Sequence, residues 1–510
     1  MSGPDETIAA CLAKGGGAAN AIGALRRPWL THGALRDLIA RTVADLNAMG
    51  IGRGDRVAIV LPNGPEMAAA FLCIASGATA APLNPACNQR DFGFYLDDLR
   101  ARALIALPDD APLARAAAAE RGIPVFDLVP GEDAAGIFEL RGTALGIAAK
   151  PGMAEPDDIA LILHTSGTTA RPKIVPLSHR NVAASARHIG ASLELEPDDL
   201  CLNIMPLFHI HGLIAAVLAS LTAGSAVWCA PGLNGFRFFG WIAQIRPTWF
   251  TAVPTMHRTL LELAPRFQAL LTQAPGERRL RFIRSSSAPL PAPVMRELEQ
   301  VFGVPAIEAY GMTEAAHQMA ANPLPPRPRF PGSAGIAAGP DLAILDPSGQ
   351  LLPPGTIGEV AVRGPNVMAG YENNPSANAA AFHDGWFRTG DLGTLDADCY
   401  LRLTGRLKEI INRGGEKISP SEVEAVLLDH PAIGQAVVFA MPDRLMGETV
   451  AAAVVVRDGM TVDETDLREF AAMRLTAFKV PAKIVTLKQL PVGATGKLQR
   501  IGLAERLGLA

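Results

Sequence analysis

The sequence predicts an α/β protein with at least two domains. Three observations support this: the chain has 510 residues of which 49% are hydrophobic, strand and helix patterns alternate over its first two thirds, and β-rich and small α+β segments follow. A chain of this length supports several hydrophobic cores rather than one. Alternating strands and helices are typical of βαβ units in a parallel sheet.

Hydrophobic periodicity predicts two runs of alternating elements, one before residue 157 and one between 157 and 320. The alanine-rich helix predicted at 111–121 is expected to lie on the surface. The predicted strands are 56–61, 78–82, 159–163, 226–229, 249–253 and 281–285, and the predicted helices are 35–49, 65–76, 111–121, 256–263 and 292–301.

The pattern changes after about residue 335. Short strands and turns up to about 403 predict a small β-barrel. Beyond Gly405 a new set of elements predicts a separate α+β domain, so the expected domains are 1–405 and 406–510. The elements of this last domain are helices 420–429 and 464–474 and strands 433–440, 449–457 and 483–487.

Composition excludes several classes of function. The net charge is −4, and no basic patch with interleaved aromatic residues predicts nucleic-acid binding. The six cysteines are scattered, without the pairs typical of zinc sites or disulfide frameworks. The N-terminus does not resemble a signal peptide, and the apolar run 213–221 is too short to span a bilayer. We therefore expect a cytoplasmic protein without a membrane anchor that acts on small molecules, as a monomer or a homodimer.

The segment HTSGTTARPKIV, residues 164–175, has the chemistry of a phosphate-binding loop. An apolar run leads into five residues that are hydroxylated or glycine, and Lys173 follows them. Glycine lets the backbone approach a phosphate, N–H groups and hydroxyls donate, and lysine supplies charge. No second glycine precedes the lysine, so the kinase and GTPase loop is not indicated. By itself the segment also fits an ordinary turn. The five residues are Thr165, Ser166, Gly167, Thr168 and Thr169.

Later clusters also carry suggestive chemistry, although each fits an ordinary turn when taken singly. Tyr310 offers a face on which a base can stack, Thr313 a hydroxyl, and Glu314 a carboxylate that suits Mg²⁺. Asp391 can accept from the hydroxyls of a ribose, and Lys497 stands in a glycine-flanked loop. The clusters are YGMTEAAHQM from residue 310, RTGD at 388–391, GRLKEIINRGGEKISPSEVE at 405–424 and GATGK at 493–497.

In this order and spacing the motifs resemble the adenylate-forming superfamily, which contains acyl-CoA synthetases, peptide-synthetase adenylation domains and beetle luciferases. The resemblance covers about 30–500. It implies a large N-terminal domain of two α/β lobes plus a small β-barrel, and a small mobile C-terminal domain. It also implies an ATP-dependent acid–CoA ligase that works through an acyl-adenylate, releases AMP and pyrophosphate, and uses Mg²⁺ and coenzyme A.

The resemblance further implies roles for the matched residues. Lys497, Thr313 and Glu314 would be catalytic, with Glu314 also a Mg²⁺ ligand. A lysine between a carboxylate and the α-phosphate would offset their repulsion and stabilise the transition state. Lys408 would be the hinge, and the Gly414–Gly415 segment would replace Lys497 for thioester formation. The residues implied in ATP binding are Thr165, Ser166, Gly167, Thr168, Thr169, Lys173, Ser286, Ser287, Ala288, Tyr310, Gly311, Asp391 and Arg406.

Two positions in the loop depart from the family pattern. The family commonly has glycine where this chain has Ala170 and again where it has Ile174. Isoleucine is bulky and stiff at χ1, so the detailed conformation of the loop is expected to differ.

The acid is indicated by PLFHIHGL at 206–213 and FIRSSSAPL at 282–290. A long-chain or aromatic acid would need an apolar pocket, whereas histidines, serines and an arginine suit a small polar acid with a second carboxylate. PLFHIHGL, together with YGMTEAAHQM and the proline-rich run after it, looks most like the matching segments of oxalate–CoA ligases. A purely structural role for His211 and Arg284 remains open. The predicted acyl-substrate residues are His209, His211, Arg284, Ser285 and His317.

Other functions remain open from the sequence. The acid could be malonate, a medium-chain acid or an aromatic acid. The acyl group could be loaded onto a separate carrier protein, or the chain could be a non-catalytic nucleotide-binding protein. Retention of Lys497, Glu314 and Asp391 argues against the non-catalytic alternative.

Overall fold

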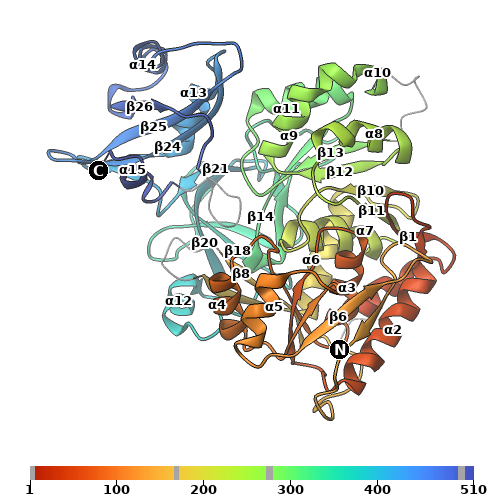
Figure 1. Cartoon of the computed structure of the whole chain (residues 1–510). Coiled ribbons are helices and arrows are strands. Elements are labelled where there is room, and N and C mark those ends of the chain that lie inside the picture. The colour runs from red at the N-terminus through yellow and green to blue at the C-terminus, as the bar shows by residue number, and fades with distance from the viewer. Residues whose placement is uncertain (1–5, 166–171, 272–279, 492–499, 510) are drawn as a thin grey trace. The chain divides into compact units, whose positions relative to one another are not determined.

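The computed structural model describes residues 6–165, 172–271, 280–491 and 500–509. Contacts divide the chain into two units, whose elements are labelled in Figure 1. The first unit contains residues up to 165, 173–341 and 363–379, and the second contains 342–362 and 380–510. This division groups strands before residue 405 with the C-terminal elements. The boundary predicted at 405, with its hinge, stays a prediction.

One sheet of the first unit has seven strands in the order β7-β6-β5-β3-β4-β8-β9. Its inner strands run parallel, and β7 and β9 are antiparallel to their neighbours. The inner strands are nearly continuous apolar runs because parallel strands are covered on both faces. The strands are β3 Arg56–Val60, β4 Thr79–Pro82, β5 Ala103–Ala106, β6 Val125–Pro130, β7 Phe138–Arg141, β8 Ile159–Thr165 and β9 Lys173–Ser178.

The helices that accompany this sheet differ in how deeply they are buried. Helix α3, Pro65–Ala75, buries almost every residue. Helix α5, Pro112–Ala119, was expected on the surface, but three of its alanines are buried in one cluster with apolar residues of α4. Small side chains allow this close packing. The other helices of this part are α1 Ile8–Cys11, α2 His32–Ala48, α4 Gln89–Leu99 and α6 His179–Ser192.

The second sheet of this unit has nine strands in the order β16-β15-β14-β13-β12-β10-β11-β1-β2. The strands from β11 to β14 are parallel, and β15 turns back antiparallel to β14. The strands are β1 Asn20–Gly23, β2 Leu30–Thr31, β10 Leu200–Asn203, β11 Ala226–Cys229, β12 Trp249–Ala252, β13 Phe282–Ser285, β14 Ala306–Met312, β15 His317–Ala321 and β16 Ile336–Ala337.

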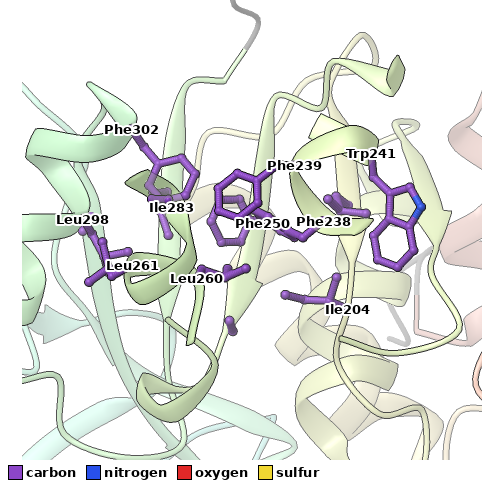
Figure 2. Close-up of a cluster of buried hydrophobic side chains, with 14 of the residues drawn as sticks. Ile204, Phe238, Phe239, Trp241, Phe250, Leu260, Leu261, Ile283, Leu298 and Phe302 are labelled. Carbon is purple, nitrogen blue, oxygen red and sulfur yellow. The ribbon is translucent and has the colours of Figure 1, made fainter. Parts of the chain in front are cut away.

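A large hydrophobic cluster covers one face of this second sheet. Helices α8 Gly235–Ile245, α9 Pro254–Leu263 and α11 Ala292–Phe302 supply side chains that pack on strands β10 to β13. Figure 2 shows the rings of Phe239 and Phe250 near its middle, with Trp241 at one end. Burial of this apolar surface holds the strands in place, and these strands carry polar residues at their carboxyl ends.

The second unit contains two smaller sheets. In the β-rich segment, β18 Gly358–Arg363, β19 Phe382–His383, β20 Trp386–Leu395 and β21 Leu401–Arg406 pair antiparallel in one five-stranded sheet with β17 Asp341–Leu345. The C-terminal sheet has the order β23-β22-β25-β24, with β26 beside β25. Its elements are β22 Ile411–Arg413, β23 Glu416–Ile418, α13 Pro420–Leu428, β24 Ile433–Asp443, β25 Gly447–Val456, α14 Glu464–Ala472, β26 Lys483–Thr486 and α15 Leu503–Arg506.

The predicted α+β elements after Gly405 are therefore confirmed with small shifts of their ends. In the described part of the chain, no helix has both the length and the apolar composition needed to cross a bilayer.

Candidate active site

The predicted phosphate loop joins two paired strands. Thr165 ends β8 and Lys173 begins β9, and the two residues are partners across the antiparallel pair. Lys173 is partly buried, and its Nζ lies 4.1 Å from the ring centroid of Tyr371. The residues between them that were predicted to bind ATP, namely Ser166, Gly167, Thr168 and Thr169, lie outside the described residues, as does Ala170.

The departure at Ile174 has a structural explanation. Its side chain is 5% exposed and belongs to a core cluster beneath the seven-stranded sheet, together with residues of β3 and α4. The position is therefore part of the packed strand β9, where an apolar side chain is stabilising and the freedom of glycine is not needed. Its carbonyl accepts a hydrogen bond from the backbone N–H of Glu372 at 3.2 Å.

A polar cluster lies at the carboxyl ends of β12 and β13, the side of a parallel sheet where ligands usually bind. His211 begins the π-helix η2, His211–Leu218. Its Nδ1 lies 3.0 Å from the hydroxyl of Ser287, and its Nε2 lies 2.6 Å from the hydroxyl of Thr251. The rings of His211 and His317 meet with centroids 4.9 Å apart. Wide helical turns of this kind are frequent at functional sites.

Arg284 stands behind this cluster and is fully buried. Its guanidinium lies 3.4 Å from His211 Nε2 and donates to the side-chain oxygen of Gln318 at 3.1 Å. Because a guanidinium can only donate, Nε2 accepts and Nδ1 carries the proton that His211 donates to Ser287. The hydroxyl proton of Ser287 is then available for another acceptor.

The polar cluster around Arg284 carries a positive charge and no negative charge among the described residues. Burial lowers the pKa of Arg284 to about 9, so the guanidinium is still charged at neutral pH. Burial, followed by the charges of His317 and Arg284, holds the pKa of His211 well below its usual value, so this ring is neutral. Within the described ranges Arg284 forms no ion pair, and its Nε has no hydrogen-bond partner. A buried cation without a carboxylate is costly.

Backbone conformation near the cluster is unusual. Ser287, Ala316 and His317 have φ of 73°, 48° and 105°, in the left-handed region that non-glycine residues rarely adopt. Such strain costs on the order of 1–3 kcal/mol per residue and concentrates at functional sites. Ser287 is thereby turned toward His211, while Ser286 is buried and donates to the carbonyl of Ala309 at 2.8 Å.

The other predicted residues of this region are placed as follows. Ser285 ends β13 and is buried, and its hydroxyl has no hydrogen-bond partner in the described part of the chain. Ala288 is exposed, and His209 is partly buried with its ring beside that of Phe208, at 4.5 Å between centroids. Tyr310 is partly buried on β14 and is a partner of Ala320.

The turn after β14 carries the predicted catalytic pair. Thr313 is partly buried and begins the short helix η4, Thr313–Ala315. Glu314 is 6% exposed, and its Oε1 accepts a hydrogen bond from the hydroxyl of Tyr371 at 2.9 Å. Just before the turn, Gly311 lies so close to β15 that an added Cβ would stand 1.7 Å from the carbonyl oxygen of His317. Only glycine fits there.

Glu314 suits a magnesium ion as a single protein ligand. A carboxylate has about four lone-pair sites, so the bond from Tyr371 leaves acceptor capacity. Mg²⁺ usually keeps several waters and takes one or two carboxylates together with substrate phosphates. Across the described ranges there is no cluster of three or more metal-binding side chains.

The second unit contains the remaining predicted residues. Asp391 on β20 and Arg406 on β21 are strand partners, and Arg406 Nε donates to Asp391 Oδ1 at 2.6 Å. Asp391 is 7% exposed. Gly414 and Gly415 form the turn between β22 and β23 with φ of 58° and 94°, as tight hairpin turns require. Lys408 follows β21. Lys497 lies outside the described residues.

Three site residues were not predicted from the sequence: Thr251, Gln318 and Tyr371. Thr251 and Gln318 are ordinary polar residues on predicted strands or turns, and only the strand order β15-β14-β13-β12 shows that they surround Arg284. The sequence did offer a hint for Tyr371. It is one of only four tyrosines in the chain, and it stands in a turn-rich segment, where binding residues are common.

Comparison with known proteins places this site in a family. The model of the AMP-binding enzyme family matches residues 13–372, and that of the AMP-binding enzyme C-terminal domain matches 422–497. The first match spans more than half of the chain. The chain therefore belongs to the AMP-binding enzymes, and within them it is an ATP-dependent acid–CoA ligase that works through an acyl-adenylate.

Similar proteins support this assignment along the whole chain. The oxalate–CoA ligase of Arabidopsis thaliana is 45% identical over 479 residues, 92% of each chain. That of Saccharomyces cerevisiae is 39% identical over 480 residues, 89% of this chain and 87% of the relative. The crystal structure of ATP-bound MatB from Rhodopseudomonas palustris has a TM-score of 0.86 at 30% identity and covers 98% of this chain and 99% of its own. These findings confirm the predicted α/β fold with a large N-terminal and a smaller C-terminal domain, and they support ATP binding. The predicted small β-barrel corresponds to the five-stranded sheet of β17 to β21, which is open among the described residues.

Proposed function

We propose that the acid activated by this enzyme is oxalate. The carboxylate of oxalate attacks the α-phosphorus of ATP, the bond to the β-phosphate breaks, and pyrophosphate leaves. The thiol of coenzyme A then attacks the oxalyl-adenylate, AMP leaves, and oxalyl-CoA is formed.

The observation that carries this proposal is the buried charge of Arg284, which has no ion-pair partner among the described residues. Oxalate brings a second carboxylate that remains after activation, and a buried cation favours an anion nearby. Arg284 is fully buried, so we infer that it acts through its neighbours. It holds His211 in the tautomer that leaves the Ser287 proton available, and that proton would be donated to the second carboxylate. A hydrogen bond to a charged acceptor is among the stronger ones in proteins.

The names of the relatives agree with the polar cluster. Two proteins that align over nearly the whole chain are called oxalate–CoA ligases. A medium-chain or aromatic acid would have to bury apolar surface beside a charged guanidinium, which is unfavourable. Malonate, with one more carbon, remains the second candidate because it also has two carboxylates.

The proposed roles in ATP binding follow the family resemblance residue by residue. Lys173 and the 165–169 segment would hold the β- and γ-phosphates, and Ser286 and Ala288 would line the adenine site with Tyr310 and Gly311. Ser287, which the sequence also assigned to ATP binding, is proposed instead to contact the acid because its hydroxyl is bonded to His211. Asp391 and Arg406 would hold the ribose. A magnesium ion held by Glu314 would neutralise charge on the phosphates, and Thr313 would touch the α-phosphate.

Two further roles remain proposals. Lys497 would stand between the acid and the α-phosphate during adenylation. Rotation about Lys408 would then bring the Gly414–Gly415 segment to the site for attack by coenzyme A, because a hinge needs only a few residues that absorb changes of φ and ψ. We also propose that the protein works in the cytoplasm, as a monomer or a homodimer.

A substrate panel tests the choice of acid. AMP release that depends on both ATP and coenzyme A would be measured with oxalate, malonate, succinate, acetate, benzoate and octanoate. We expect kcat/KM to be highest for oxalate and to fall by about 10-fold or more for acetate, which lacks the second carboxylate.

The competing acids give different results in the same panel. A higher value for malonate would transfer the proposal to the three-carbon acid. Octanoate or benzoate well above oxalate would show that the polar cluster does not contact the acid. Product analysis by mass spectrometry would verify that the thiol of coenzyme A, rather than a carrier protein, accepts the acyl group.

A further inference from the structure

Residues 366–372 form a segment that is hydrogen-bonded both to the turn that carries Glu314 and to strand β9, which begins with Lys173. The segment bonds to the turn at one end, where the backbone N–H of Met368 donates to the carbonyl of Glu314 at 2.8 Å. At the other end the N–H of Glu372 donates to the carbonyl of Ile174. The segment is thus tied to both predicted sites of ATP chemistry in the first unit.

Tyr371 is held firmly within this segment. The side chain of Asn378 accepts from the N–H of Tyr371 at 2.7 Å and donates to its carbonyl at 2.8 Å. The next residue, Glu372, forms a two-pronged ion pair with Arg56 on β3, with both distances 2.8 Å. Tyr371 itself is 8% exposed. Its ring therefore has little freedom to move.

The two ends of the Tyr371 side chain contact two opposite charges. The ring face lies under the ammonium of Lys173, at 4.1 Å from the centroid, and the hydroxyl donates to Glu314 at 2.9 Å. A cation over an aromatic face is attracted by the ring quadrupole, and a hydroxyl bonded to a carboxylate fixes its orientation. The interposed ring therefore holds the lysine and the carboxylate each in a defined place.

We propose that Tyr371 is a positioning residue that holds the phosphate-binding Lys173 and the metal-binding Glu314 in fixed positions relative to each other. This inference rests on the roles proposed above for Lys173 and Glu314, and it is independent of which acid is used. The hydroxyl of Tyr371 orients Glu314 toward the metal of Mg·ATP, while its ring keeps Lys173 aimed at the phosphates. One side chain thus serves two ligands, and its two functions can be separated by mutation.

The test measures ATP binding by calorimetry at a series of Mg²⁺ concentrations, without acid or coenzyme A. Tyr371→Phe keeps the ring and loses the hydroxyl. It should raise the Mg²⁺ concentration at half-maximal enhancement of binding by roughly 10-fold, with ATP affinity at saturating Mg²⁺ nearly unchanged. Tyr371→Leu loses both groups and should also weaken ATP binding at saturating Mg²⁺ by about 5-fold.

Two reference variants define the comparison. Glu314→Gln should shift the Mg²⁺ dependence at least as far as Tyr371→Phe does. In a Lys173→Met background, Tyr371→Leu should bring no further loss of ATP affinity at saturating Mg²⁺, because the ring then has no ammonium to hold. Tyr400→Phe changes another buried tyrosine, in the second unit, and should match the wild type in both measurements.

The outcomes separate this inference from the proposed function. A shifted Mg²⁺ dependence in Glu314→Gln together with an unchanged one in Tyr371→Phe would overturn the role of Tyr371 alone. Equal effects of Tyr371→Phe and Tyr371→Leu on both quantities would also overturn it, since they would indicate general loosening. An unchanged Mg²⁺ dependence in Glu314→Gln would refute the assignment of the metal to Glu314, and the role of Tyr371 would fail with it.

Discussion

Single residues determine the chemistry of this site through the placement of charge. Ser287 and His211 were predicted to lie near the substrates, and the structure joins them through one hydrogen-bonded cluster backed by Arg284. Arg284 has an amide, a hydroxyl and an imidazole as neighbours rather than a carboxylate. A buried arginine of this kind is poised to complement an anion that arrives with the substrate.

Replacing Arg284 should change the choice of acid more than the stability of the fold. In Arg284→Met, kcat/KM for oxalate should fall by about 100-fold, because His211 is no longer held in the tautomer that frees the Ser287 proton and the buried positive charge that favours the second carboxylate is gone. The value for acetate should change little. Thermal unfolding should occur at the same or a higher temperature, because an apolar side chain replaces a buried charge.

Arg296→Met serves as the control, since it removes an exposed positive charge from α11. It should leave both acids unaffected. A parallel loss of activity with oxalate and acetate in Arg284→Met would contradict a role in selecting the acid.

At the level of elements, close packing of the β14–β15 pair shapes the turn that presents Glu314. Gly311 on β14 stands directly against the backbone of His317, which begins β15. By contrast Gly190, within helix α6, has nothing within 4 Å of the place where a Cβ would be. The two glycines are required to very different degrees, although both are single glycines within a regular element.

Alanine at these two glycines should have opposite effects on the free energy of unfolding in urea. Gly311→Ala should lower it by about 3 kcal/mol, because the added carbon overlaps a carbonyl oxygen and the strands must separate. Gly190→Ala should raise it by about 0.5–1 kcal/mol, because glycine in a helix interior is unfavourable relative to alanine. Equal changes in both variants would show that the approach of β14 to β15 is less close than described.

At the level of the whole molecule, six histidines have a pKa lowered by burial. Burial lowers the pKa of His179 and His257 to about 4. His179 is satisfied in its neutral form, since its Nδ1 accepts from the N–H of Ile8 and its Nε2 donates to the carbonyl of Ala75. Others with pKa lowered by burial are His32, His164, His188 and His211.

These histidines should make the protein acid-sensitive. A lowered folded pKa means that the unfolded chain binds more protons as pH falls below 6.5, so stability falls from about pH 6.5 toward 4. Glu308, whose pKa burial raises to about 8, and Glu424, whose pKa is also raised, act in the opposite direction. Six histidines outweigh two carboxyls, so the unfolding temperature should decline from pH 7 to pH 4.5.

His179→Gln tests the origin of this decline. Glutamine can accept and donate as neutral histidine does, but it does not titrate, so the pH dependence should become shallower by about one proton. An unfolding temperature that is flat from pH 7 to pH 4.5 in the wild type would contradict the prediction.

Much of the fold was predictable because local patterns are strong where strands are fully buried. The strand at 226–229 has the predicted bounds, and those at 249–253 and 281–285 differ by one residue. The burial of α5 was not predictable, because alanine is tolerated equally on a surface and in a tight helix contact. The sequence could not show why isoleucine replaces glycine at position 174. The reason is that the Ile174 side chain packs in the core, which is a tertiary contact.

The sequence by itself determined the class of enzyme, since phosphate binding and acid activation require particular residue types in a particular order along the chain. Only the tertiary structure decided which of these residues act together. Arg284, Gln318 and Thr251 meet because β12, β13 and β15 lie in one sheet, and Tyr371 reaches Lys173 and Glu314 across long separations in the chain. Contacts between distant segments depend on strand order and packing, which no local pattern encodes.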